Sequence, residues 1–302
     1  MSSLEPLLNR LLEKYQHTAP SGSSITDIPG VYFFWSTEEL PRTPLLYSAS
    51  IVIIGQGFKI GYLGDRKFRY DRETYLVLGV PIPFECETHA SLHEPLLGIS
   101  IDIDVAMLHE LVSKFSGNLH LERSDTSTEP HTGVEPVQMS SSMIDATTRL
   151  LSCLNDPLDS RILGNAAVGE IVYRVLRDKK GHVLYNLTQH QTPYAAVARA
   201  LERIHTDYRE TLTVEDLAKE TAMSVSSFHR AFKRVTGESP LQYLKKIRLD
   251  KARSLLVHDK MRVNNVAFEV GYESPSQFSR EFKRYFNVPP SDAHTIAYSY
   301  LA

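Results

Sequence analysis

Two stretches of the chain, 50 residues apart, place the same kinds of side chain at the same spacing. Residues 227–234 read Ser-Phe-His-Arg-Ala-Phe-Lys-Arg, and residues 277–284 read Gln-Phe-Ser-Arg-Glu-Phe-Lys-Arg. In each stretch two phenylalanines lie four residues apart, so they share one face of a helix and can pack on a core. The opposite face then carries polar and basic side chains: His229, Arg230 and Lys233 in the first copy, Ser279, Arg280 and Lys283 in the second. Such side chains can bind the base edges and phosphates of nucleic acid.

Each copy sits in a larger repeated unit. A short amphipathic helix precedes it, at residues 214–218 and again at 266–269, and a proline follows it, at Pro240 and Pro290. The stretch 241–257 predicts one long helix between the two units. A single copy would fit the exposed face of any helical protein equally well. Two copies in fixed order favour a double helix-turn-helix that binds DNA.

The turns inside the two units differ. Gly271 suits a turn that needs a positive φ, whereas the first turn reads Ala222-Met223-Ser224. If Ala222 adopts a positive φ, the cost is about 1 kcal/mol; otherwise the first turn has another shape. We therefore expect the first unit to be docked less tightly than the second.

The charge distribution agrees with a nucleic-acid partner. The net charge is −3, but residues 199–302 carry 17 Lys and Arg against 13 Asp and Glu, and the remainder carries 16 against 23. A basic end on an acidic protein is expected of a DNA-binding domain joined to another domain. Cys86 and Cys153 match no zinc or disulfide spacing. The chain shows no signal-peptide pattern and no apolar run of membrane-spanning length, so we expect a cytoplasmic protein that does not bind a membrane.

Catalytic and metal-binding patterns are weaker. Glycines at 55, 57, 61 and 64 open no helix, so strand and turn positions explain them better than a dinucleotide loop. His89 and His93 have acidic neighbours, but a surface loop explains them better than a metal site, and we expect no metal or cofactor. Cys86 could sense an oxidant or electrophile, but its neighbours Glu85 and Glu87 disfavour the thiolate that such a reaction needs. No Ser-His-Asp pattern is present.

The first 180 residues predict a β-rich domain with flanking helices. An amphipathic helix is expected at 3–16, and short strands at 31–35, 45–54, 58–63, 67–70, 74–78 and 96–103, with Gly64-Asp65 as a hairpin turn. This spacing favours a compact antiparallel barrel or sandwich. Helices are expected at 104–115, 141–154, 159–177 and 193–207, and a mobile loop at 123–133. We predict domains at 1–180 and 194–302 with a linker at 181–193.

The second unit resembles the C-terminal domain of the AraC/XylS family of bacterial transcription regulators. The resemblance is carried by Ala267-Phe268-Glu269-Val270-Gly271-Tyr272-Glu273-Ser274, by the stretch from Phe278 to Arg284, and by Pro289-Pro290, and it extends over residues 194–298. It implies that two recognition helices enter successive major-groove segments, with the helix at 241–257 setting their separation.

The resemblance also implies roles for single residues. Base contacts fall on Ser226, His229, Arg230, Ser276, Gln277, Ser279 and Arg280. Arginine suits guanine and glutamine suits adenine. Phosphate contacts fall on Lys233, Arg234, Lys283 and Arg284. One member of each Lys-Arg pair could instead lie over the core of its own domain.

Residues 31–122 resemble, more weakly, the cupin-like barrel that a subset of this family uses to bind a small effector. Leu63-Gly64-Asp65-Arg66, Phe68-Arg69-Tyr70, Tyr75-Leu76-Val77 and Val80-Pro81-Ile82-Pro83 carry the likeness. Aromatic side chains that could line the pocket are Tyr32, Phe34, Tyr47, Phe58, Phe68, Tyr75 and Phe84. For half or more of them, a position in the plain core or on the barrel surface is the better explanation.

We therefore expect an α+β protein: an N-terminal β-rich cupin-like barrel with flanking helices, and a C-terminal all-α double helix-turn-helix domain. Its expected function is effector-responsive transcriptional regulation, favouring activation, rather than catalysis. Expected partners are double-stranded DNA, a small effector, RNA polymerase and a second copy of the chain. The helices at 141–177 could dimerise through Leu150, Leu151 and Leu154 or through Ile171, Val172 and Val175, or could cover their own barrel. Two alternatives remain: a metal-dependent cupin enzyme with a DNA-binding tail, and a regulator controlled by a partner protein.

Overall fold

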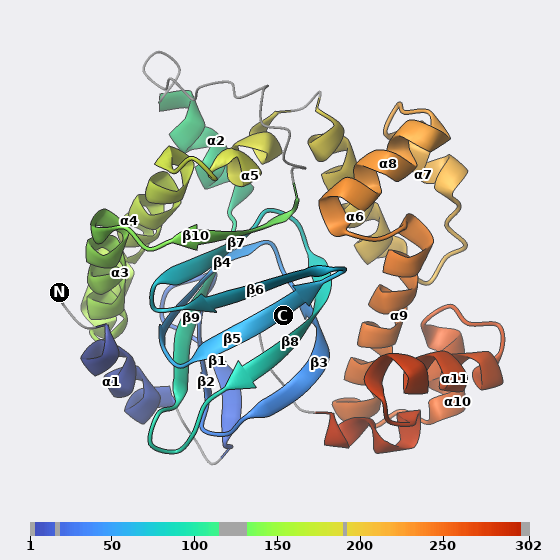
Figure 1. The fold of residues 1–302 in the computed structure, drawn as a ribbon, viewed down its shortest axis with the longest axis horizontal. Helices are drawn as coiled ribbons and strands as arrows, with labels where there is room; N and C mark the ends of the chain where they lie inside the picture. The colour runs from blue at the N-terminus through green and yellow to red at the C-terminus, as the bar shows by residue number, and fades with distance from the viewer. Residues whose placement is uncertain (1–3, 16–18, 115–131, 190–191, 297–302) are drawn as a thin grey trace.

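The computed structural model describes residues 4–15, 19–114, 132–189 and 192–296. Its N-terminal domain is one antiparallel sheet that curls on itself, and its C-terminal domain is helical (Figure 1). Helix α1 (Glu5–Tyr15) precedes nine strands: β1 Ser21–Ile25, β2 Val31–Ser36, β3 Leu40–Tyr47, β4 Ser50–Gln56, β5 Phe58–Leu63, β6 Arg66–Asp71, β7 Thr74–Leu78, β8 Ile82–His89 and β9 Leu96–Asp102. The strand order is β1-β2-β9-β4-β7-β6-β5-β8-β3, and β10 (Val134–Gln138) pairs with β7.

The predicted hairpin at Gly64-Asp65 is confirmed: Gly64 has φ 58°, and Leu63 pairs with Arg66 across the turn. Strands β1, β8 and β10 were not predicted, and the single strand predicted at 45–54 is wrong, because β3 ends at Tyr47 and β4 begins at Ser50. Strand β8 contains Pro83 and the charged Glu85 and Glu87, residue types that are depleted in strands, so its composition does not predict a strand. It forms because it pairs with β3 on one side and β5 on the other.

The sheet has two apolar faces, as strand alternation requires. In β4, Ile51 and Ile53 belong to one core, and Val52 and Ile54 belong to the other. Figure 1 shows α1, α3 and α4 on one side of the sheet and the C-terminal helices on the other. The first core is thus shared with α1 and these helices, and the second with the C-terminal domain.

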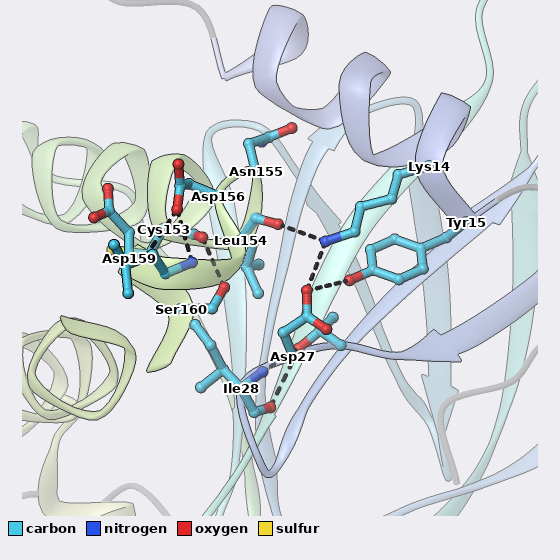
Figure 2. Close-up of polar contacts among 12 residues, drawn as sticks. Lys14, Tyr15, Asp27, Ile28, Cys153, Leu154, Asn155, Asp156, Asp159 and Ser160 are labelled. Atoms are coloured by element: carbon cyan, nitrogen blue, oxygen red, sulfur yellow. Dashed lines mark hydrogen bonds and ion pairs between the residues drawn. The ribbon is translucent and has the colours of Figure 1, made fainter. Parts of the chain in front are cut away.

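Helices α2 (Val105–Lys114), α3 (Ser141–Leu154) and α4 (Pro157–Arg177) appear close to their predicted ranges. Figure 2 shows the corner where α1 meets the junction of α3 and α4: Lys14 donates to Asp27 at 2.6 Å and to the carbonyl of Leu154 at 3.3 Å. At that junction Asp156 caps α4 by accepting from the backbone N–H of Leu158 and Asp159. This corner fixes the direction in which α4 leaves α3.

The six residues suggested for dimerisation are all buried in the chain's own first core. These are Leu150, Leu151, Leu154, Ile171, Val172 and Val175. The helices therefore cover their own sheet with these side chains, and the expectation that these six residues form a dimer interface is wrong. The large apolar side chains of α4 that remain exposed are Leu158, Ile162 and Leu163.

The expected linker is partly folded. Residues 182–188 form α5 (His182–Tyr185) and the short 3₁₀ helix η1 (Asn186–Thr188), with Val183 and Leu184 buried in the first core. The domain boundaries themselves stay a prediction. Most of the loop expected at 123–133 lies outside the described residues, but Gly133 is buried rather than in a surface loop.

The C-terminal domain contains α6 (Pro193–Asp207), α7 (Val214–Glu220), α8 (Val225–Thr236), α9 (Pro240–Val257), α10 (Val263–Glu269), α11 (Pro275–Phe286) and the 3₁₀ helix η2 (Pro290–Thr295). Each predicted helix is present within a few residues. The predicted pattern of two helix-turn-helix units joined by one long helix, α9, is confirmed.

Candidate nucleic-acid interface

The first unit consists of α7, a tight turn and α8. Ala222 in the turn has φ 56°, so the alternative with the positive φ is the one realised. Ser224 caps α8 by accepting from the backbone N–H of Ser227, and Gly237 ends the helix with φ 81°. Phe228 and Phe232 are fully buried, as predicted. The opposite face of α8 therefore points away from the core.

The second unit, α10 and α11, repeats this geometry. Gly271 has φ 85° in the turn, and a Cβ there would lie 2.6 Å from the carbonyl oxygen of Arg209, so a larger residue does not fit. Ser274 caps α11, and Asn287 ends it with φ 62°. Phe278 and Phe282 occupy the buried positions of Phe228 and Phe232. The 50-residue repeat in sequence is therefore also a structural repeat.

The structure places the predicted base-contacting residues at the surface of the two helices. Six of them are exposed: Ser226, His229, Arg230, Ser276, Gln277 and Arg280. Ser279 is half-buried.

The four predicted phosphate contacts, Lys233, Arg234, Lys283 and Arg284, are all exposed. Within the described ranges none of these four forms a salt bridge, whereas other basic residues of the domain do. These pairs are Arg203 with Asp207, Arg209 with Glu269, Lys245 with Glu281 and Lys246 with Glu238. Both α8 and α11 therefore carry exposed basic side chains that have no salt-bridge partner among the described residues.

The two units have separate cores. Tyr243, Leu244 and Ile247 of α9 pack into the second core of the sheet together with Phe228 and Phe232. Leu249 and Ala252, further along α9, pack with Phe278 and Phe282 in a third core. The first unit therefore shares a core with the N-terminal sheet, and the second does not.

Arg248 bridges the two units at the point where these cores meet. Its guanidinium donates to three backbone carbonyls: Tyr208 at 2.7 Å, Glu210 at 2.8 Å and Gly271 at 2.9 Å. The first two precede the first unit, and Gly271 is the turn glycine of the second. Sequence reasoning missed this residue because nothing local marks its three partners.

The second core contains only part of the predicted effector pocket. Phe34, Tyr47, Phe68 and Phe84 lie together there. Tyr75 belongs to the other core, so it does not line the same interior. Phe58 stacks on the ring of His89 at 4.4 Å, and both side chains are partly exposed. Tyr32 interacts with Asp102, which raises the pKa of Tyr32.

A buried polar cluster of the interior was missed by the sequence reasoning. The hydroxyls of Tyr47 and Tyr70 lie 2.6 Å apart, and Cys86 Sγ lies 3.3 Å from the first and 2.9 Å from the second. Lys59 is also buried, with its Nζ 5.8 Å from the centre of the Phe34 ring and 6.0 Å from that of Tyr47. Burial lowers the pKa of Lys59. Strand alternation around Cys86 was the available signal.

The acidic residues on either side of Cys86 in the sequence do not face its thiol. Glu85 and Glu87 point to the opposite face of β8, where Glu85 pairs with Arg42 and Glu87 accepts from the hydroxyl of Tyr62 at 2.9 Å. The ionisable side chains that interact with Cys86 are those of Lys59, Tyr47 and Tyr70. The two acidic neighbours in sequence therefore do not define the thiol's surroundings.

Hydrogen bonds join the N-terminal domain to the first helix-turn-helix unit. The N–H of Gly133 donates to the carbonyl of Val235 in α8 at 2.8 Å. The hydroxyl of Tyr243 donates to the carbonyl of Pro81 at 2.8 Å and lies 2.7 Å from His205 Nε2. Since that hydroxyl has one hydrogen, Nε2 is the donor to it.

The remaining candidate sites have structural explanations. Gly57 has φ 71° between β4 and β5, so it is a turn glycine. His89 ends β8, and His93 lies in the exposed loop that follows, so the two are not one helical turn apart. Within the described part of the chain, no group of three His, Cys, Asp or Glu residues could hold a metal ion. Nor is any helix in that part long and apolar enough to cross a membrane.

Known proteins resemble both domains. Residues 27–183 match the family model described as AraC-type transcriptional regulator N-terminus, and residues 217–295 match that of a helix-turn-helix domain. The lactose operon transcription activator of Staphylococcus xylosus is 34% identical over 96 residues, which is 32% of this chain and 34% of that protein. AlkR of Acinetobacter baylyi is 38% identical over 94 residues, 31% of each chain. These alignments span about a third of the relatives' length.

One solved structure covers nearly the whole chain. ToxT from Vibrio cholerae, in complex with an unsaturated fatty acid, aligns over 93% of this chain and 97% of its own with a TM-score of 0.59. At 14% identity this likeness concerns the fold alone. The two-domain arrangement is thus shared with ToxT. Since the N-terminal family match alone covers more than half of the sequence, the chain belongs to the AraC family of transcriptional regulators.

Proposed function

We propose that the protein is a sequence-specific DNA-binding regulator that reads two successive major-groove segments with α8 and α11. The observation that carries this is the repeated exposure of polar and basic side chains on two helices whose opposite faces are buried. At the proposed phosphate-contacting positions these side chains have no salt-bridge partner among the residues that the structure describes. In this assignment Arg230 and Arg280 contact base edges, and Lys233, Arg234, Lys283 and Arg284 contact phosphates. Such a protein acts in the cytoplasm together with RNA polymerase.

The assignment separates two kinds of variant. Arg280→Ala should relax base preference at one operator position, costing about 1–3 kcal/mol on the preferred sequence. Lys283→Ala should weaken binding to all sequences alike and reduce the dependence of log Kd on log salt concentration by about one unit. Both are measured by fluorescence anisotropy on operators selected in vitro with the full-length protein. Unchanged operator affinity in Arg280→Ala would remove the assignment.

The interior of the N-terminal sheet is the proposed effector site, and Lys59 suggests an acidic effector. Lys59 is buried beside the rings of Phe34 and Tyr47, in a low-dielectric interior that strengthens attraction to an anion. ToxT, which shares the fold, holds an unsaturated fatty acid. Both point to an apolar molecule with a carboxylate.

Calorimetric titration with oleate tests this effector class. Lys59→Met should weaken binding about tenfold or more, because a charge-assisted hydrogen bond contributes about 1.5–3 kcal/mol. Lys67→Met, which removes an exposed lysine of β6, is the matched control and should bind as the wild type does. Equal affinities in all three proteins would argue against a role for Lys59.

Effector binding would act on the first unit. The sheet interior and α8 share a core, and Gly133 bonds directly to the last turn of α8. A ligand that shifts the interior would change how α8 is held before it affects α11, which α9 carries. A second copy of the chain could bind the exposed Leu158 and Ile162 of α4; this dimer is part of the proposal.

A further inference from the structure

The side-chain amide of Gln277 is held from within its own helix. Its Nε2 donates to Glu281 Oε1 at 3.2 Å, one turn along α11. Glu281 is itself fixed by two other elements. The hydroxyl of Tyr272 donates to its Oε2 at 2.9 Å, and Lys245 Nζ of α9 donates to its Oε1 at 3.1 Å. With 14% of its side chain exposed, Glu281 is a rigid anchor rather than a freely moving surface acid.

The charge of Glu281 dictates which end of the amide faces it. Burial alone would raise the pKa of Glu281, but the hydrogen bonds from Gln277, Tyr272 and Lys245 outweigh it and hold the pKa below its usual value. The ionised carboxylate only accepts hydrogen bonds, so Gln277 must turn Nε2 toward it. The carbonyl oxygen Oε1 is thereby directed away from the anchor.

An amide held in one orientation distinguishes base pairs better than one that can flip. Adenine presents a donor, N6, beside an acceptor, N7, in the major groove, and the amide must offer its oxygen and its second N–H in the matching order. A freely rotating amide can exchange the positions of its oxygen and its N–H groups and form hydrogen bonds with other bases. Holding it in advance also removes the entropy cost of ordering the side chain on binding.

The first unit contains no such anchor. A shift of 50 residues places Ser227 and Ala231 at the positions of Gln277 and Glu281. The counterpart of Tyr272, which follows the turn residue Gly271, is Met223, which follows the turn residue Ala222. None of the three can supply a carboxylate or a phenol. The two recognition helices therefore share their fold but not this arrangement.

We infer that Glu281 is a positioning residue that orients Gln277 for an A·T base pair, and that the operator segment contacted by α11 consequently carries the sharper sequence preference. This inference rests on the proposed DNA-binding function. Arg280, in the same helix, contacts a different base, so its contribution can be separated from that of Gln277.

The test compares base preference among variants of the full-length protein. An operator is selected in vitro, and duplexes carrying each of the four base pairs are made at every position. The position whose preference is lost in Gln277→Ala is the one that Gln277 reads. Dissociation constants for its four duplexes are then measured for the wild type, Gln277→Ala, Glu281→Ala, Glu281→Gln and the double variant Gln277→Ala/Glu281→Ala. Glu269→Ala is the control, because it removes an acid of the same unit that pairs with Arg209 instead.

We expect the wild type to prefer A·T about tenfold at this position, and Glu281→Ala to reduce the ratio to about threefold. In the Gln277→Ala background, removal of Glu281 should leave the ratio unchanged. Loss of a negative charge near DNA changes all four affinities equally and cancels in the ratio. Glu281→Gln retains the size of the side chain and leaves the amide free to flip, so it should also reduce the ratio if the alanine variant does not fold.

Three results are decisive. A wild-type ratio that persists in both Glu281 variants overturns the positioning role while Gln277 stays a base contact. A preference unaffected by Gln277→Ala at every position overturns the inference at its first step. Absence of sequence-specific binding by the wild type is a separate failure, that of the proposed function itself.

Discussion

Replacing Arg248 by methionine should uncouple the two helix-turn-helix units. Methionine keeps an apolar stem of similar length but cannot donate to the carbonyls of Tyr208, Glu210 and Gly271. The two units have separate cores, which are joined by α9, by this guanidinium, by the ring of Tyr208 and by the ion pair of Arg209 with Glu269. The second unit should therefore remain folded but hold its position less well.

The expected size follows from the three hydrogen bonds. A hydrogen bond to a charged group contributes about 1.5–3 kcal/mol, but Arg248 is half-buried and the released carbonyls regain water, so we expect a loss of about 2–4 kcal/mol in the free energy of unfolding. To bind both operator segments, the variant must return its second unit to the native position. If this costs about 2 kcal/mol, the affinity of the variant for the operator falls about 30-fold.

Two DNA duplexes reveal the effect on function. One carries both operator segments, and in the other the segment contacted by α11 is scrambled. The wild type should prefer the first strongly, because the second unit binds at high effective concentration. Arg248→Met should bind the scrambled duplex normally and lose about tenfold or more on the complete operator. Lys251→Met, a cation removed from the next turn of α9, is the control. A loss of unfolding free energy below about 1 kcal/mol, with the preference for the complete operator unchanged, would refute this reasoning.

Three further predictions concern the turns, acid stability and assembly. Gly271→Ala should lose at least about 2 kcal/mol in chemical denaturation, because it adds backbone strain to a clash with a carbonyl, whereas Ala222→Gly, at an exposed turn, should change stability by less than about 1 kcal/mol. Burial lowers the pKa of His205 to about 4. The free energy of unfolding should therefore keep its full value above pH 6.5 and fall by an amount on the order of 3 kcal/mol as the pH drops from 6.5 toward 4. In His205→Gln, whose amide can still donate to Tyr243, melting curves should lose this pH dependence. Ile162→Glu should shift sedimentation toward the monomer at micromolar concentration, and a wild type that is already monomeric would exclude this interface.

Much of the C-terminal domain followed from local sequence patterns. The spacing of Phe228 and Phe232, and of Phe278 and Phe282, identified the buried face of each recognition helix, and with it the exposed face. The positive φ of Gly271 was anticipated because a tight turn between two helices restricts a single residue, whereas for Ala222 the sequence left a positive φ and another turn shape open. Helices and turns are determined by neighbours within a few residues, so the sequence alone could predict them.

The N-terminal interior and the links between units depended on distant partners. Strand β8 forms through pairing with β3 and β5, and only that pairing turns Cys86 toward Lys59 and away from Glu85. Gln277 was predicted as a base contact, but its anchoring by Glu281 depends on Tyr272 and on α9.

The two helix-turn-helix units and their exposed faces could be predicted from the amino-acid sequence, because helical periodicity is local. The contacts that hold those units could not: the hydrogen bonds of Arg248, those of Glu281, and the core that α8 shares with the sheet. Those contacts join residues far apart in sequence, and their geometry exists only once the chain has folded.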